Sequence, residues 1–189
     1  MKEYKDLLDQ IWTTRISRVN AEKRLKEKES FFQAVNIYYS CATIIFSILS
    51  LLEDNKNLSL ITVFMTVSLL IVILYLNGQN YLEHARKYRK NYTELQKLEF
   101  ELKYIGNSNE EIERIFTEYC DLLDSSSNHI SFDYYKTVYH SSGEYKERRW
   151  IGGVKWLYWY NVIYRGLLKI CVVLLPILLW YICRWKCGR

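Results

Sequence analysis

The chain has 189 residues, of which 50% are hydrophobic and 16% aromatic, and its formal net charge is +5. Seven glycines and one proline are too few turn residues for a many-stranded β sandwich or barrel, and the apolar content excludes a disordered chain. The apolar residues are gathered in runs close to the roughly 20 residues that a helix needs to cross a bilayer. The composition therefore predicts an all-α integral membrane protein: a transmembrane helical hairpin with long cytoplasmic helices and a third, C-terminal transmembrane helix.

Residues 1–30 are highly charged and predict a cytoplasmic amphipathic helix. Their apolar side chains recur every three or four residues, which places them on one helical face. These side chains are Leu8, Trp12, Ile16 and Val19. No glycine or proline separates this segment from the apolar run that follows. We therefore expect one long helix that continues into the membrane.

Residues 31–76 predict a transmembrane hairpin. The run 31–52 corresponds to about 33 Å of helix, and the run 58–76 carries no charged residue. The polar residues 53–57 between the two runs leave room only for a tight antiparallel connection.

Residues 77–149 predict a cytoplasmic helical module. A charged helix over 79–104 has an apolar seam with coiled-coil spacing, and a capping box at Ser108 predicts a further helix over 109–124. The seam consists of Tyr81, Ala85, Tyr88, Tyr92 and Leu95. Residues 125–149 are polar, rich in tyrosine and interrupted by turn signals.

Residues 150–189 form an aromatic-rich C-terminal segment. Its apolar core, 166–179, is flanked on both sides by Trp and Tyr, which is typical of the two interfaces of a bilayer. Lys169 lies close to the start of this core, where its side chain can reach back to the headgroups, and Pro176 predicts a kink. The segment therefore predicts a third transmembrane helix over 166–183. A re-entrant helix, or a helix in the membrane plane, is the alternative.

The distribution of Lys and Arg predicts the orientation in the membrane. Residues 1–30 carry eight basic residues and residues 77–156 carry twelve, whereas the turn 53–57 carries one. We therefore expect a multi-pass protein of the bacterial inner membrane, with the N-terminus and residues 77–156 in the cytoplasm. The five cysteines show no metal-binding spacing and are expected to be reduced thiols, with a Cys183–Cys187 bond as the alternative if the C-terminal end is extracytoplasmic.

No feature of the sequence indicates catalysis. His84, His129 and His140 lie far apart, and no Gly-rich phosphate loop precedes a helix, so neither a metal site nor a cofactor is expected. The basic cluster 86–90 follows the second apolar run, a position that favours anionic lipid over nucleic acid. We expect a protein that is not an enzyme, that contacts membrane lipid and that does not bind nucleic acid.

The first apolar run carries a stripe of polar side chains. On a helix of 100° per residue, six residues spaced by three and four fall within an arc of about 100°. They are Gln33, Asn36, Ser40, Thr43, Ser47 and Ser50. The second run adds a shorter stripe of Ser59, Thr62 and Thr66. Such stripes serve either close helix packing or the lining of a pore made by several copies, and the amides of Gln33 and Asn36 favour the pore.

Several short motifs around the hairpin resemble the SLATT family of bacterial two-transmembrane effector domains. The resemblance covers roughly residues 8–140, and the motifs occur in the same order as in the family. They are WTTR at 12–15 with Arg18, Ala21 and Arg24-Leu25, then ARKY at 85–88 with Tyr92, LQKL at 95–98, Tyr119 and NHISFDYY at 128–135. The aromatic-rich segment 150–189 departs from the family pattern.

The resemblance implies a membrane effector of anti-phage defence that assembles with copies of itself into a pore and disrupts the inner membrane. Its implied trigger is an upstream signal, and its implied partner is a co-encoded signal synthase or reverse transcriptase. The family has no catalytic residues. The matching motif residues would be signal-sensing or structural: Arg15, Arg18, Arg24, Asn128, His129 and Asp133.

Two functional hypotheses follow from the sequence. In the first, the stripe on 31–52 lines a pore, and Asn77-Gly78 is a hinge through which the cytoplasmic helices open it. In the second, the protein is a membrane-anchored scaffold without a pore, which recruits a cytoplasmic partner such as a nucleic-acid enzyme.

Overall fold

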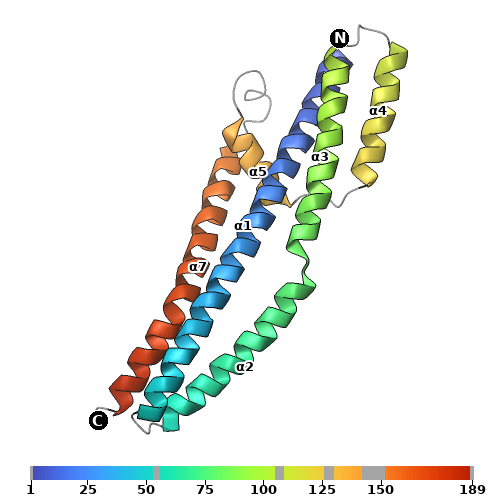
Figure 1. Ribbon diagram of the computed structural model, residues 1–189. Helices are drawn as coiled ribbons and strands as arrows, with labels where there is room; N and C mark the ends of the chain where they lie inside the picture. Colours follow the sequence, from blue (N-terminus) through green and yellow to red (C-terminus); the bar gives the residue numbers. More distant parts are fainter. Residues whose placement is uncertain (1, 53–55, 105–108, 126–129, 142–151, 188–189) are drawn as a thin grey trace. The chain divides into compact units, whose positions relative to one another are not determined.

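The computed structural model describes residues 2–52, 56–104, 109–125, 130–141 and 152–187, and these are helical apart from short connections (Figure 1). The helices are α1 (Lys2–Leu52), α2 (Lys56–Gly78), α3 (Tyr81–Tyr104), α4 (Asn109–Asp124), α5 (Ser131–His140) and α7 (Gly152–Cys187). No strand is present among these described residues. The predicted all-α fold is confirmed.

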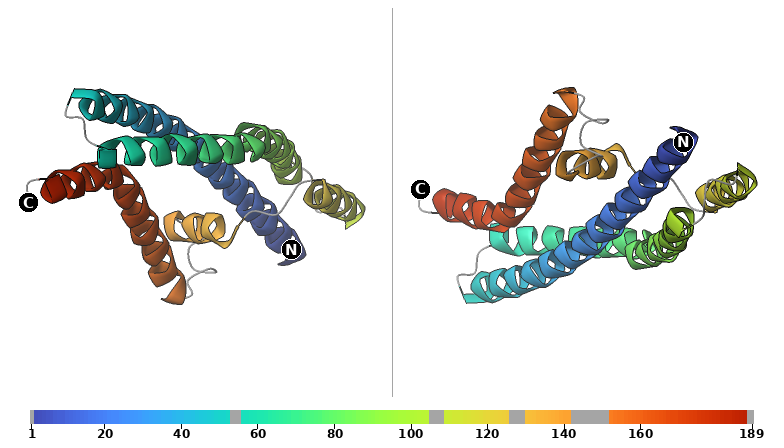
Figure 2. Two further views of the ribbon diagram at one scale, coloured as in Figure 1. Left: turned by 90° about the horizontal axis from the view of Figure 1, so that it is seen from below. Right: turned by 90° about the horizontal axis from the view of Figure 1, so that it is seen from above.

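Among the residues that the structure describes, three stretches of helix are long and apolar enough to cross a membrane. They lie in α1, in α2 and in α7, as the all-α membrane fold with a hairpin and a third membrane helix predicts. The charged N-terminal part of α1 continues into the first apolar run without a break, over 51 residues. Pro176 lies inside α7, and Figure 2 shows α7 changing direction in its C-terminal half.

The chain divides into two compact units. We call Met1–Glu27 with Tyr81–Val162 the helical module, and Lys28–Asn80 with Ile163–Arg189 the membrane unit. Both α1 and α7 contribute to both units, because each helix crosses a boundary between them.

The helical module has an apolar core between α3, α4 and the N-terminal part of α1. Its buried side chains are Leu7, Ile11, Leu95, Leu98, Leu102, Ile115 and Tyr119. Along α3, the predicted seam is buried at Tyr81, Ala85, Tyr88 and Leu95, and Tyr92 is half-buried. This spacing explains why α3 packs against its neighbours although most of its surface is charged.

The buried face of α1 in the helical module differs from the predicted one. The predicted residues Leu8, Trp12, Ile16 and Val19 are all half-buried. The buried residues are Leu7, Ile11, Ser17, Arg18, Ala21, Glu22 and Leu25. The reason is that α1 packs on more than one side. It contacts α3 and α4 through Leu7 and Ile11, and it contacts α5 through polar side chains.

Helix α5 lies in a region where the sequence predicts only polar residues and turns. It begins after Ile130, and no side chain caps its first turn. Two aromatic stacks join it to α7: the ring of Tyr158 lies 5.9 Å from Phe132 and 4.6 Å from Tyr139. These tertiary contacts stabilise a short helix that has little intrinsic preference to form.

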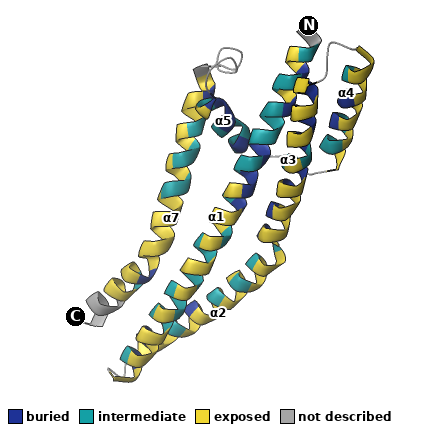
Figure 3. Ribbon diagram, turned by 45° about the horizontal axis from the view of Figure 1, so that its top comes forward, coloured by how far each residue is buried: buried dark blue, intermediate teal, exposed yellow. Residues whose placement is uncertain are grey.

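The membrane unit has a small apolar core and a large apolar surface. The core consists of Phe46, Leu58 and Met65, and Leu179 of α7 packs against it. Most other apolar side chains of the three membrane helices are exposed (Figure 3), as expected where lipid rather than protein surrounds them.

Side-chain contacts define the directions of the three membrane helices. Lys169, near the start of the apolar part of α7, lies over the ring of Phe31, near the start of the apolar part of α1. The two helices therefore run in the same direction, and α2 runs in the opposite direction.

The junction between α2 and α3 is a short break at Gln79 and Asn80. Gln79 N–H donates to the carbonyl of Leu76 at 3.1 Å, and Asn80 has a φ of 47°, in the left-handed region. Asparagine is one of the few residues other than glycine that tolerates this conformation. The predicted hinge residues Asn77 and Gly78 lie within α2, so the break falls just after them.

Candidate functional site

The polar stripe of α1 consists of two rows, each with a seven-residue spacing. Because seven residues turn a helix by about 700°, each row drifts by only about 20° per step. We call Gln33, Ser40 and Ser47 the outer row, and Asn36, Thr43 and Ser50 the inner row. The rows are three residues apart, which is about 60° around the helix axis.

The inner row is directed toward the rest of the membrane unit. Ser50 is buried, and its Oγ donates to Ser59 Oγ of α2 at 2.8 Å. Thr43 is half-buried, and its hydroxyl donates to the carbonyl of Tyr39 on its own helix at 2.7 Å. Asn36 is half-buried beside α2. This row therefore contributes to packing of the hairpin.

The short stripe of α2 is satisfied largely within the same helix. Thr62 donates to the carbonyl of Leu58 and Thr66 to the carbonyl of Thr62, each at 2.8 Å. Ser59 accepts the hydrogen bond from Ser50. Such hydroxyls can face lipid without leaving a polar group unpaired.

The outer row is open. Gln33 and Ser47 are exposed and Ser40 is half-buried. The next heptad row around the helix is apolar and strongly exposed: Ile37 66%, Ile44 60% and Leu51 82%. The amide of Gln33 donates to Glu29 at 2.9 Å, whereas no other described residue hydrogen-bonds the side chain of Ser40 or Ser47. The outer row is thus a polar line on the lipid-facing surface of the unit.

A pocket of about 500 Å³ lies between α1, α2 and α7 within the membrane unit. Its lining is apolar apart from a few polar groups, among them the amide of Asn36. Asn36 Oδ1 is buried and has no hydrogen-bond partner among the described residues. The pocket therefore contains an amide oxygen whose hydrogen-bonding capacity is unused.

Two tyrosines of α1 attach α7 within the membrane unit. The hydroxyl of Tyr39 donates to the carbonyl of Val172 at 2.7 Å, and the hydroxyl of Tyr38 donates to the carbonyl of Val173 at 3.1 Å. The ammonium of Lys169, which the sequence predicts to reach toward the headgroups, lies 5.0 Å from the centre of the Phe31 ring. This is a cation–π distance.

The motif residue Arg24 forms a two-point ion pair with Asp133, another motif residue. Arg24 Nε donates to Asp133 Oδ1 at 2.9 Å, and Nη2 donates to Oδ2 at 3.1 Å. Next to this pair, the hydroxyl of Thr137 contacts Ser17 Oγ at 3.1 Å and accepts from Asn20 at 2.9 Å. The ion pair and the two contacts of Thr137 bind α5 to α1. Asn128 and His129 lie outside the described residues.

Arg15 occupies a second ion pair on α1. Its Nε donates to Glu99 of α3 at 2.7 Å, and Lys103 donates to the other oxygen of the same carboxylate at 2.7 Å. Glu99 is buried. Arg15 and Lys103 both bind this carboxylate, and their positive charges offset the cost of burying it.

The third motif arginine, Arg18, is fully buried between α1, α3 and α4. Its Nη1 donates to the carbonyl of Leu122 at 3.1 Å, and Asn91 donates to the same carbonyl at 2.8 Å. Leu122 lies in the last turn of α4, where backbone carbonyls lack helical partners and the helix dipole is negative. Burial lowers the pKa of Arg18, whereas the phenols of Tyr119 and Tyr88 act in the opposite direction. Nε and Nη2 have no partner among the described residues.

The SMODS and SLOG-associating 2TM effector domain family 5 matches the chain over residues 1–182. The chain belongs to this SLATT family. The predicted resemblance is therefore confirmed and extends into α7, beyond the residues that carried it. No curated protein and no solved structure matches the chain.

Membership of the SLATT family makes the chain a membrane effector of the kind found in defence systems. The family description specifies two transmembrane helices, whereas three helices in the described part of this SLATT chain are long and apolar enough to span. Helix α7 lies largely within the matched residues.

Several residues of the site in this SLATT chain were not anticipated from the sequence. Tyr38 and Tyr39 sit in an apolar run that otherwise predicts only a membrane helix, and Glu99 and Thr137 carry no motif. Pro176 was one available signal, because a proline inside a membrane helix frees a carbonyl that another side chain must satisfy. The partner of that carbonyl cannot be read from the sequence.

Proposed function

We propose that this SLATT-family chain is a homo-oligomeric, pore-forming membrane effector of bacterial anti-phage defence. The observation that carries the proposal is the outer row of α1. Gln33, Ser40 and Ser47 form a polar line that is open in the single chain and borders the exposed apolar row of Ile37 and Ile44. A polar group without a partner in hydrocarbon costs several kcal/mol.

Assembly of several copies satisfies the outer row. If copies pack side by side with their outer rows turned inward, the serine hydroxyls and the Gln33 amide face water in a shared lumen. The same row would otherwise lie against lipid tails. The inner row is already used within the chain, through the Ser50–Ser59 hydrogen bond, so it supports the hairpin rather than the lumen.

The rest of the proposal concerns the membrane, the orientation of the chain in it and the trigger. We propose that the membrane helices lie in the inner membrane with the N-terminus and residues 77–156 in the cytoplasm, and the excess of Lys and Arg in these segments supports this orientation. Because the family description names association with SMODS and SLOG, we propose that a protein of one of these kinds supplies the trigger. Once triggered, the assembled chains disrupt the membrane directly, without catalysis and without a cofactor.

The test is the membrane potential of bacteria that express the chain with and without its genomic neighbours, reported by a potential-sensitive dye. The variant is the triple substitution Gln33→Leu, Ser40→Leu and Ser47→Leu. The matched control is the triple substitution Ile37→Leu, Ile44→Leu and Ile48→Leu, on the exposed apolar surface of the same helix. All chains are compared at equal abundance in the membrane.

We expect the triggered wild type and the apolar control to collapse the potential and the outer-row variant to retain it. Collapse in all three would show that the lumen is lined elsewhere and would overturn the role of the outer row. If the inserted wild type never collapses the potential under any trigger, the pore is wrong and the membrane-anchored scaffold remains.

A further inference from the structure

Pro176 leaves a backbone carbonyl of α7 without its usual donor. In an α-helix, the N–H of each residue donates to the carbonyl four positions earlier, and proline has no N–H. For Pro176, that carbonyl belongs to Val172. Within a bilayer no water is present to replace the missing donor, so another group of the protein must do so.

Tyr39 of α1 supplies the missing donor, and Tyr38 adds a second hydrogen bond beside it. Tyr39 donates to the carbonyl of Val172 at 2.7 Å, and Tyr38 donates to that of the next residue, Val173, at 3.1 Å. The hydroxyl of Tyr39 thus donates to the carbonyl that the N–H of residue 176 would otherwise reach. Without a proline at this position, the carbonyl of Val172 would accept a hydrogen bond from an N–H of its own helix. It would then be a weaker acceptor for the hydroxyl of Tyr39.

Apolar packing holds α7 only weakly. Between residues 170 and 182, Pro176 is buried and Leu179 is half-buried, whereas every other side chain is exposed. The pocket of about 500 Å³ beside Val172 and Leu179 further reduces the contact of α7 with the hairpin. The two tyrosine hydrogen bonds therefore provide a large share of the attachment.

We propose that Tyr38, Tyr39 and Pro176 form a latch that docks α7 on α1 and keeps the effector closed until it is triggered. The second half of this proposal rests on the proposed pore. A hydrogen bond between membrane helices changes a docking equilibrium by only about threefold to twentyfold, so the latch holds but can be released. Because α7 forms one wall of the pocket that contains Asn36, its release exposes this amide and leaves that side of the hairpin free to pack against another copy.

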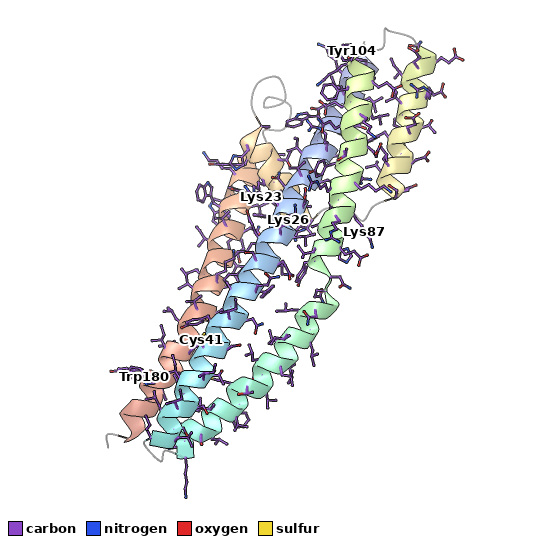
Figure 4. All side chains as sticks on the ribbon, in the orientation of Figure 1. Lys23, Lys26, Cys41, Lys87, Tyr104 and Trp180 are labelled. Carbon is purple, nitrogen blue, oxygen red and sulfur yellow. The ribbon has the colours of Figure 1, made fainter. Side chains whose placement is uncertain are left out.

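The docking of α7 can be measured with two native cysteines. Cys41 on α1, which is labelled in Figure 4, and Cys171 on α7 are both exposed. After Cys120, Cys183 and Cys187 are replaced by Ser, spin labels at these two positions report the distance between the helices by double electron–electron resonance. Labelled chain is diluted with unlabelled chain in lipid nanodiscs so that distances within one chain dominate.

The labelled chain with Tyr38, Tyr39 and Pro176 unchanged should give one narrow distribution of the distance between the two spin labels. The double substitution Tyr38→Phe and Tyr39→Phe removes only the two hydroxyls and should increase an undocked, broader population about tenfold. Tyr75→Phe, at an exposed tyrosine of α2, is the matched control and should change nothing. A distribution that stays narrow in the double variant would overturn the latch.

Pro176→Ala provides the test that is specific to the mechanism. It restores the N–H that satisfies Val172, so the carbonyl becomes a weaker acceptor for Tyr39 and α7 should undock as far as in the single variant Tyr39→Phe. Adding Tyr39→Phe to Pro176→Ala should then have no further effect. Effects that add would show that Tyr39 and Pro176 act independently, which contradicts the proposal.

The functional half is tested by the membrane potential without any trigger. The double Phe variant should depolarise cells that the unvaried chain leaves polarised, and Tyr75→Phe should not. If α7 undocks in the nanodiscs but the potential is unchanged, the latch does not restrain the effector. The triggered wild type, measured in parallel, separates this result from a failure of the pore itself.

Discussion

Arg24 and Asp133 meet through two parallel hydrogen bonds, 2.9 and 3.1 Å long, although 109 positions separate them in the sequence. Asp133 is completely buried, and the side chain of Arg24 is 17% exposed. Both residues belong to the motifs for which the sequence left signal-sensing and structural roles open. Their contact joins α5, which carries Asp133, to α1, which carries Arg24.

Arg24→Ala should destabilise the helical module strongly. The substitution leaves the buried carboxylate of Asp133 without its counterion, and breaking one partner of a buried pair costs about 3–5 kcal/mol. The measurement is thermal unfolding in detergent, followed by tryptophan fluorescence. Lys97→Ala, which breaks the exposed pair with Glu94, is the control and should cost about 0.5 kcal/mol or less. Equal shifts in the two variants would contradict the prediction.

Arg18→Met should leave the free energy of unfolding unchanged or raise it. The buried guanidinium has two nitrogens without partners, and apolar residues of similar size often replace buried charges at no cost. The carbonyl of Leu122 keeps its donors from Asn91 and Ser125. The same unfolding measurement applies. A loss as large as that of Arg24→Ala would mean that the guanidinium is fully satisfied in the membrane-bound protein.

Asn80→Ala should lower the free energy of unfolding, because it destabilises the left-handed conformation at the break between α2 and α3. Asn80→Gly should leave the free energy of unfolding unchanged or raise it. A side chain with a Cβ pays about 1–2 kcal/mol in the left-handed region, which asparagine partly offsets and glycine avoids. Gln79→Ala, one residue earlier, is the control. The prediction fails if the Ala and Gly variants at position 80 unfold at the same temperature.

Ser50 and Ser59 should show energetic coupling in a double-mutant cycle of serine to alanine substitutions. Their hydroxyls are 2.8 Å apart, and hydrogen bonds between membrane helices contribute about 0.6 kcal/mol on average. The readout is unfolding in detergent. As a control, Ser50→Ala combined with Thr62→Ala should be additive, because Thr62 bonds to its own helix. Additivity in the serine cycle would show that this hydrogen bond does not contribute.

The membrane architecture and the long first helix could be predicted because apolar run length and the absence of Gly and Pro are local properties. The buried face of α1 could not. Leu8 and Trp12 have the apolar pattern, but Arg18 and Ser17 are buried because α4 and α5 offer them hydrogen bonds. Such partners lie more than 100 positions away. Helix α5 was missed for the same reason, since its stability comes from contacts with α1 and α7.

The polar stripe was predicted as a single surface, and the structure divides it. The periodicity gives the angle of each residue around the helix, but only the position of α2 decides which edge is covered. Ser50 is therefore buried, whereas Ser47, 60° away around the axis by helix geometry, is open. The contact of Tyr39 with Val172 could not be predicted either, because no local pattern relates the two residues.

The uninterrupted course of α1 has a mechanical consequence. A helix of 51 residues, about 77 Å long, carries the motif arginines near one end and both polar rows toward the other. A rotation of this helix by about 60° about its own axis, applied where Arg15 and Arg24 hold it, would bring the inner row to the azimuth that the outer row had occupied.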